Sequence, residues 1–285
     1  MNELTINYKV KEDLSLLLED DFTISTLSLK TGVSERTIKS TLSSYENLTN
    51  RTLEKIYSFV YRQGYRLNII KEELYKESYK NLILFHGSKH GINSILPNGS
   101  RDNCDFGEGF YLGETFNQVI SFVSDFDSSC VYSFNIDINN LKVVKFDCSF
   151  DWLIAVCYYR GYIEQYKSNK TITKLIKSID DCDLIIAPIA DNKMFYIMQQ
   201  FAEGEITSEV AMHSLSASNL GNQYVLKSEK AINQLIPLEK HYICNEEKED
   251  SLKELLERGK LIETKLKVSK RDYRNKGKFI DELFE

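Results

Sequence analysis

Five short runs rich in β-branched and aromatic residues constrain the fold of this chain more than any other feature. They are LILFH (82–86), CVYSFNID (130–137), LKVVKF (141–146), CDLIIAPIA (182–190) and QYVLK (223–227). Runs of this length that are bounded by Gly, Asn and Asp predict β-strands. Stretches with helical spacing alternate with them, namely WLIAVCYYRG (152–161), YIMQQFAEG (196–204) and TSEVAMHSL (207–215). This alternation predicts an α+β domain over residues 80–240.

The first 76 residues have a different character, since they contain no proline and their apolar residues recur three and four apart. This spacing predicts an all-helical domain over residues 1–76. Within it, TLSLKTGVSERTIKSTL (26–42) predicts a helix that ends at Gly32 and a second helix that Ser34 caps. Leu27, Val33 and Ile38 fall where such a pair of helices buries its contacts.

This pair of helices resembles the helix-turn-helix module of bacterial repressors. The segment TNRTLEKIYSFVYRQG (49–64) predicts a further helix that completes the bundle and stops at Gly64. The resemblance implies a DNA partner contacted through Arg36, Lys39 and Ser40 on the outer face of the second helix. A helical hairpin that only packs or dimerises fits the same pattern.

Composition bounds the class of protein. The chain has 285 residues, of which 42% are hydrophobic and 27% are charged, as in ordinary soluble proteins with one or two domains. No apolar run approaches the roughly 18 residues of a membrane span. The first residues have no apolar signal core, so we expect a cytoplasmic protein without a membrane partner. The net charge of −6 means that a nucleic-acid contact needs a local basic face.

The cysteines and the C-terminal residues are less informative. The six cysteines form no Cys-x-x-Cys pair, which favours reduced thiols over a zinc ribbon. Residues 241–285 are highly charged with spaced leucines, and they predict a helical extension. Such a helix either docks on its own protein or makes a homodimer contact.

Three motifs carry candidate chemistry. The first predicted strand stops at His86, which Gly87 and Ser88 follow. The second motif, DFGEGFYLGE (105–114), has two glycines, Gly107 and Gly109, that are followed by Phe110 and Tyr111, so the backbone there can approach a ligand closely. The third is NQYV, which opens the last predicted strand at Gln223. Taken singly, each also suits a buried histidine, a glycine-rich turn or an ordinary strand.

Together, L-x-F-H-G-S, F-G-x-G-x-Y and N-Q-Y-V resemble the His-Tyr-Glu signature of the ADP-ribosyltransferase superfamily. The likeness is to its poly(ADP-ribose) polymerase and diphtheria-toxin branch, and it covers residues 82 to 236. The runs D-F-G-x-G-F-Y-L, D-L-I-I-A-P-I-A-D and Q-Y-V-L-K-S-E-K-A further resemble a little-characterised bacterial family of suspected toxins or phage-defence effectors. The resemblance implies a split β-sheet with helices, NAD as the substrate, and an antitoxin as a partner.

The resemblance also implies roles for individual residues. His86 would hold a ribose hydroxyl of NAD, and the Gly87 backbone, beside Ser88, would hold the nicotinamide amide. Tyr111, which follows Gly109 of the glycine pair, would stack on the nicotinamide ring. Two further residues are added as NAD contacts: Phe122 as a second stacking aromatic and Arg160 as a partner of the diphosphate.

Gln223 stands at the position of the third residue of the signature, which is usually a glutamate. An amide can still hold the ribose 2′-hydroxyl, but it carries no charge and cannot act as a base. One solution is another carboxylate, for which Glu108, Glu205 and Glu209 are candidates. The other is that glutamine suffices because the acceptor is already a strong nucleophile that the enzyme only has to position.

The sequence therefore predicts an NAD-dependent ADP-ribosyltransferase that modifies an unidentified protein or nucleic acid. Gln223 favours an alternative from another class, a DNA-binding regulator whose second domain binds NAD or ADP-ribose without turnover. The same site could also belong to an NAD glycohydrolase. We expect no metal, because Gly87 and the preceding β-type run argue against a helix that would present His86 and His90 together.

Overall fold

The computed structural model describes residues 6–44, 48–216, 220–274 and 276–284. Contacts between residues divide the chain into two compact units. The first unit comprises residues 1–94, 115–136 and 236–253, and the second comprises residues 95–114, 137–235 and 254–285. Each unit is described by itself. The predicted domain limits, 1–76, 80–240 and 241–285, stay predictions, and residues 1–5, 45–47, 217–219, 275 and 285 within them lie outside the described residues.

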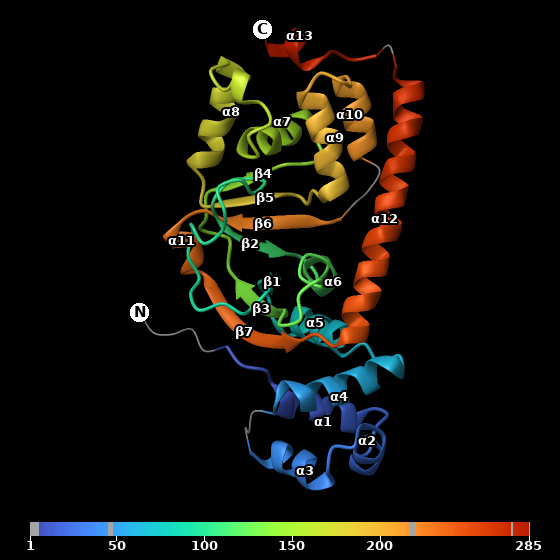
Figure 1. Cartoon of the computed structure of the whole chain (residues 1–285). Helices are drawn as coiled ribbons and strands as arrows, with labels where there is room; N and C mark the ends of the chain where they lie inside the picture. The colour runs from blue at the N-terminus through green and yellow to red at the C-terminus, as the bar shows by residue number, and fades with distance from the viewer. Residues whose placement is uncertain (1–5, 45–47, 217–219, 275, 285) are drawn as a thin grey trace. The chain divides into compact units, whose positions relative to one another are not determined.

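The first unit begins with a helical bundle, coloured from dark blue to cyan in Figure 1. Its helices are α1 (Val10–Glu19), α2 (Ile24–Thr31), α3 (Glu35–Ser43), α4 (Asn50–Arg62) and α5 (Leu67–Ser78). Leu14, Leu17, Leu27, Ile38, Leu53 and Ile56 form the centre of its apolar core. The bundle is therefore held together by the apolar residues that recur at helical spacing in the sequence.

The predicted pair of helices on either side of a tight turn is present in the structure. Gly32 ends α2 in the left-handed conformation with a φ of 68°, which glycine adopts without strain. The Ser34 side chain then accepts a hydrogen bond from the Thr37 amide at 3.1 Å and caps α3. Val33 and Ile38 are buried between the helices.

The described residues of the first unit also form three strands in the order β1-β3-β7. They are β1 (Leu82–Ser88), β3 (Cys130–Ile136) and β7 (Leu235–Tyr242), and β1 pairs antiparallel with β3. The short helix α6 (Phe116–Ile120) packs on β1 through an apolar cluster that includes Phe85, Phe116 and Val119. The predictions of strands over 82–86 and 130–137 are confirmed, whereas β7 was not predicted.

In the second unit, the residues that the structure describes form four strands in the order β4-β5-β6-β2. They are β2 (Phe110–Gly113), β4 (Val143–Lys145), β5 (Leu184–Pro188) and β6 (Asn222–Leu226). The pair β4-β5 is parallel, and β5-β6 and β6-β2 are antiparallel. The remaining three predicted strands are therefore confirmed, although the run 141–146 forms a strand only over residues 143–145. The mixture of helices with parallel and antiparallel strands agrees with the predicted α+β class.

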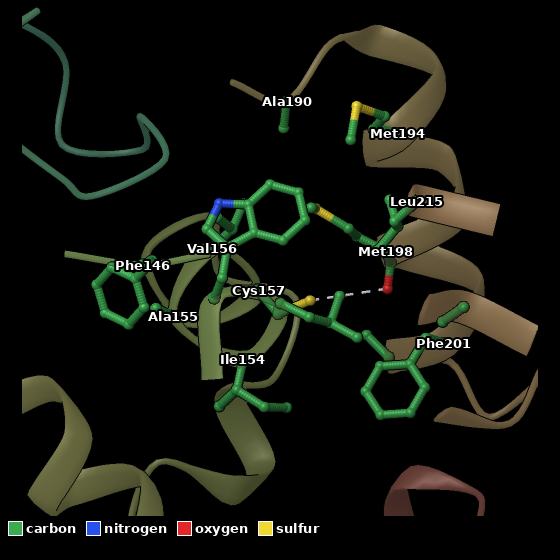
Figure 2. Close-up of a cluster of buried hydrophobic side chains, with 14 of the residues drawn as sticks. Phe146, Ile154, Ala155, Val156, Cys157, Ala190, Met194, Met198, Phe201 and Leu215 are labelled. Carbon is green, nitrogen blue, oxygen red and sulfur yellow. Dashed lines mark hydrogen bonds between the residues drawn. The ribbon is translucent and has the colours of Figure 1, made fainter. Parts of the chain in front are cut away.

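The helices of the second unit enclose its core. They are α7 (Phe150–Tyr159), η1 (Glu164–Tyr166), α8 (Lys170–Asp180), α9 (Asn192–Ala202), α10 (Ser208–Leu215), α11 (Glu229–Ile232) and α13 (Ile280–Phe284). The predicted helical extension forms α12 (Asn245–Asp272), which begins in the first unit and ends in the second. The Cys157 thiol of α7 lies 3.8 Å from the Met198 carbonyl of α9, and apolar side chains surround this contact (Figure 2). This packing fixes α7, whose last turn leads into Arg160.

Candidate functional site

His86 lies near the end of β1 in the first unit, opposite Tyr132 of β3. Successive side chains of a strand point to opposite faces of the sheet. Ile83 and Phe85 belong to the buried cluster with α6, so His86 points to the other face. It is partly exposed there, as a residue that contacts a ligand must be. The segment after β1 that leads to His90 is not helical.

The two residues after His86 are constrained by their neighbours. A Cβ atom on Gly87 would lie 2.8 Å from the Val119 carbonyl oxygen, so glycine is required for α6 to approach β1. The Ser88 hydroxyl donates a hydrogen bond to the Gly91 carbonyl at 2.9 Å and fixes the turn that follows. Phe122, just beyond α6, is 52% exposed, so its ring remains accessible.

Tyr111 lies on β2 in the second unit and holds the glycine-rich loop before it. Its hydroxyl donates to the Gly107 carbonyl at 2.7 Å and accepts from the Phe106 amide at 3.1 Å. Burial, and next the charge of Asp105, raise the pKa of Tyr111 well above its usual value, so the phenol stays protonated. Tyr111 also packs against the buried apolar core of the second unit.

The Lys227 ammonium is a second support of this loop. It donates to the carbonyl oxygens of Phe106 and Glu108, each at 2.7 Å. The Gly109 backbone fits closely against β6, since a Cβ there would lie 2.4 Å from the Val225 side chain. The loop is therefore tied at several points, and its conformation is set by β2 and β6.

Gln223 lies on β6, and its partners on the two adjacent strands have small side chains or none. Its strand partners are Gly113 on β2 and Ala187 on β5. Residues directly opposite each other on paired strands share a face, so Gln223 lies on the same face as Val225 and Tyr111. The small partners leave the Gln223 side chain room beside it, and the residue is buried with an exposed fraction of 6%.

Asp105 joins two of the predicted residues into one cluster. Its Oδ2 atom accepts a hydrogen bond from Gln223 Nε2 at 2.8 Å. Its Oδ1 atom accepts from Arg160 Nε at 3.0 Å and from Arg160 Nη2 at 2.7 Å. The Arg160 guanidinium also lies 3.3 Å from the centre of the Phe195 ring. Arg160, predicted to bind a diphosphate, therefore has a carboxylate partner within its own unit.

Sequence reasoning did not single out Asp105, although it opens the quoted motif DFGEGFYLGE. A signal was present, because an aspartate that directly precedes an apolar residue and two glycines is well placed to be carried inward by a tight turn. Its burial, with an exposed fraction of 6%, depends on partners that are distant along the chain. The Asp-Arg-Gln arrangement could thus be found only in three dimensions.

In the part of the chain that the structure describes, the three acids that the sequence suggested as replacements for the glutamate make no hydrogen bond to Gln223. Glu108, Glu205 and Glu209 are all exposed. Glu205 accepts a hydrogen bond from Gln200 Nε2 at 2.9 Å, and Glu209 packs against Gly277. Asp105 is the acid that contacts Gln223.

The candidate DNA-binding face lies on α3. Arg36 is exposed, and Ser40 is partly buried. Lys39 pairs with Glu35, one turn earlier on the same helix, at 2.8 Å. This pairing offsets half of the basic charge that the helix could offer to a phosphate.

Among the residues that the structure describes, no group of three or more His, Cys, Asp or Glu side chains is arranged to hold a metal ion. Within the same residues, no helix combines the length and the apolar character needed to cross a lipid bilayer.

Comparison with known proteins gives one match. The model of a family described as protein of unknown function (DUF3990) matches residues 82–236, which is just over half of the 285-residue chain. No curated protein matches, and no solved structure matches. The matched region begins with β1 and ends at the start of β7, so it contains His86, Tyr111, Asp105 and Gln223.

Proposed function

The chain belongs to the DUF3990 family, and on this premise we propose that it is an NAD-dependent ADP-ribosyltransferase. The observation that carries the proposal is the arrangement around Gln223. A polar side chain on a buried strand has small neighbours, lies on the same face as Tyr111 and is hydrogen-bonded to Asp105. Such a combination of an aromatic face and a few fixed polar groups is typical of sites for small organic ligands.

The proposed reaction breaks the bond between the nicotinamide nitrogen and the ribose carbon of NAD. The electron pair of this bond leaves with nicotinamide, which becomes neutral, and positive charge develops on the ribose. A nucleophile of the acceptor then bonds to the ribose carbon and releases a proton. The transition state resembles that of glycoside cleavage. Protein oxygens that accept hydrogen bonds from the sugar should therefore stabilise it.

The proposal assigns a role to residues of each unit. In the first unit, His86 is partly exposed at a strand end and can hold a ribose hydroxyl, with the Gly87 backbone beside it. In the second unit, the Tyr111 ring would stack on nicotinamide, and Gln223 would take a ribose hydroxyl. The acceptor would be a protein or a nucleic acid, as expected for a toxin or a phage-defence effector.

The test is incubation of the full chain with NAD labelled in its adenylate part, with and without cell extract. Release of nicotinamide together with label on a macromolecule supports the transferase. His86→Ala and Tyr111→Ala should each reduce this labelling at least tenfold while the protein remains folded. Asp102→Asn, an exposed change in the loop before β2, is the matched control and should label normally. Full activity of both alanine variants would contradict the assigned residues.

The neutral side chain of Gln223 favours a second candidate function, binding of NAD or ADP-ribose without turnover. The same incubation separates the two, because a binder retains NAD in calorimetry but releases no nicotinamide. Free ADP-ribose without a labelled macromolecule would instead indicate an NAD glycohydrolase.

A further inference from the structure

We propose that Asp105 is the positioning residue of this site, and that an Asp105–Gln223 pair replaces the single glutamate of the related signature. Asp105 holds the Gln223 amide in one orientation, with the Oε1 carbonyl oxygen presented to a hydroxyl of the substrate. This inference rests on the proposed function for the identity of the hydroxyl, which would belong to a ribose of NAD. The orientation of the amide is a property of the chain itself.

The orientation follows from the two partners of Gln223 Nε2. This nitrogen carries two hydrogens, and its partners are Asp105 Oδ2 at 2.8 Å and the Pro188 carbonyl oxygen at 3.1 Å. An ionised carboxylate and a carbonyl can only accept hydrogen bonds. Rotating the amide by half a turn would place Oε1 against two acceptors and lose both bonds. Gln223 therefore uses its donors within the protein, and its acceptor remains to serve a ligand.

Asp105 is itself held in place. Arg160 donates two hydrogen bonds to Oδ1, which directs Oδ2 toward Gln223. A guanidinium that approaches one carboxylate through two nitrogens fixes its direction better than an ammonium does. Lys227 and Tyr111 hold the loop that carries Asp105 by the hydrogen bonds to its backbone. These contacts therefore fix the positions of both carboxylate oxygens of Asp105.

The chemical consequence is an acceptor with enhanced negative character. A hydrogen bond from an amide N–H to a carboxylate polarises the amide and shifts electron density to its oxygen. An oxygen of this kind binds a hydroxyl donor and favours positive charge that develops on the adjoining sugar carbon. The pair thus provides what a glutamate provides as an acceptor, although it provides no proton-accepting base.

The pair also predicts that glutamate would be harmful at this position. Gln223→Glu would place one carboxylate oxygen against Asp105 and the same oxygen near the Pro188 carbonyl. Both contacts would be repulsive, since neither side would have a hydrogen to donate. The single change should therefore reduce activity, even though it restores the residue that the related signature contains.

The experiment uses three variants of the full chain: Asp105→Asn, Gln223→Glu and the double variant. In Asp105→Asn, Arg160 keeps the asparagine oxygen, so its amide nitrogen faces Gln223 and forces that side chain to turn over. The kcat for nicotinamide release should then fall by about 10- to 100-fold, with a smaller change in KM. In the double variant, the asparagine amide donates to the new carboxylate, so the second carboxylate oxygen again faces the substrate.

Partial rescue is the decisive kinetic result. The double variant should exceed both single variants in kcat by at least about fivefold. A second substitution can restore activity lost through the first only if the two residues interact. Rescue should be incomplete, since the Pro188 carbonyl still faces an oxygen. Equal or lower activity of the double variant would overturn the proposal. Asp102→Asn is the control for a lost charge in the same loop, since Asp102 is exposed, and thermal melting reports whether each variant is folded.

A measurement that is independent of activity follows the side-chain amide of Gln223 by NMR. Its two proton signals are assigned by their loss in Gln223→Glu, and both should exchange slowly with water in the unaltered chain. Asp105→Asn should shift them and speed their exchange. If the signals do not change, Asp105 does not position Gln223 and the inference fails. If the unaltered chain neither binds nor cleaves NAD, the proposed function fails while the NMR result still decides the orientation.

Discussion

The Tyr111 hydroxyl bridges the Phe106 amide and the Gly107 carbonyl, so this one side chain combines two roles that mutation can separate. The hydroxyl maintains the loop that carries Asp105. The ring supplies the flat face to which we assign nicotinamide. Tyr111, which the motif suggested because of its aromatic ring, thus also stabilises the loop before β2 through its hydroxyl.

Replacing Tyr111 by Phe or by Ala should therefore give different results. Tyr111→Phe keeps the ring but leaves two backbone groups without this partner, so stability should fall by about 1–3 kcal/mol while NAD affinity changes little. Tyr111→Ala also removes the stacking face and should weaken NAD binding by a further ~2- to 10-fold. Denaturant unfolding and calorimetry with NAD measure the two effects. Equal NAD affinities for the two variants would mean that the ring does not contact the ligand.

Glu247, in the first turn of α12, is a buried acid of the first unit. Burial raises the pKa of Glu247 to about 8, despite a hydrogen bond from Asn68 Nδ2 at 3.0 Å that favours the charged form. Asn68 Oδ1 in turn lies 3.3 Å from His241 Nδ1. The carboxyl group is consequently protonated in the folded chain at pH values where it is ionised in the unfolded chain.

This difference sets a pH dependence of stability. The unfolded pKa is 4.5, so the folded state gains from the bound proton fully below that pH and loses the gain as pH rises to about 8. The free energy of unfolding of the unaltered chain should fall by about 2–4 kcal/mol between pH 5 and 8 because of Glu247, and this fall should be absent in Glu247→Gln. Urea unfolding at both pH values measures it, with exposed Glu249→Gln as the control. Parallel pH profiles for the unaltered chain and Glu247→Gln would contradict this assignment.

At the scale of elements, the contact between β1 and α6 depends on Gly87. The nearest atom to an added Cβ is a backbone carbonyl oxygen of Val119, which cannot move without moving α6. The Val123 side chain lies 3.2 Å from the same point. The end of the strand that presents His86 is thus located by a close approach that only glycine allows.

Gly87→Ala should therefore destabilise the chain by about 1–3 kcal/mol through overpacking. Gly259→Ala on α12 is the matched control, because its Cβ would meet only Lys193 side-chain carbons at 3.5 Å. That change should raise stability by about 0.5–1 kcal/mol, since alanine favours helix more than glycine does. Thermal unfolding of both variants gives the comparison, and a neutral Gly87→Ala would show that α6 can shift freely.

Element prediction succeeded where composition and periodicity agreed, and it failed where they did not. The five β-type runs became strands because their β-branched and aromatic residues suit a pleated surface, which is buried in all of them except β4. The strand β7 was missed because LIPLEKHY contains a proline and charged residues, which are tolerated on a strand at the edge of a sheet. The helix α8 was missed between two recognised elements, although its apolar residues Ile172, Ile176 and Ile179 have helical spacing.

At the scale of the whole molecule, charge limits the partners of the helix-turn-helix. The chain carries 42 acidic and 36 basic residues, so its overall field repels DNA. The exposed basic residues of α3 are Arg36 and Lys39, and Lys39 is paired with Glu35. Any DNA contact must therefore rely on few phosphates and on specific base contacts.

Binding to an operator sequence selected from random DNA should thus show a weak salt dependence. Each phosphate contact adds about 0.9 to the slope of log affinity against log salt, so a slope no steeper than about −3 is expected. Arg36→Ala should weaken binding at least tenfold, whereas Glu35→Gln, which frees Lys39, should strengthen it. Fluorescence anisotropy measures both. Absence of selected sequences, or no effect of either change, would favour a bundle that only packs or dimerises.

The sequence by itself determined the α+β class, the two capped helices around Gly32 and the strands that carry His86 and Gln223, whereas the short strand β2 that carries Tyr111 was not predicted. These features depend on local periodicity, caps and turns, which are encoded within a few residues. Only the tertiary structure decided the partner of Gln223, because Asp105, which contacts it, lies 118 positions away along the chain, and Arg160 fixes Asp105 from a third segment. Whether a neutral amide acts as acceptor or donor depends on such distant partners, since its own chemistry allows both.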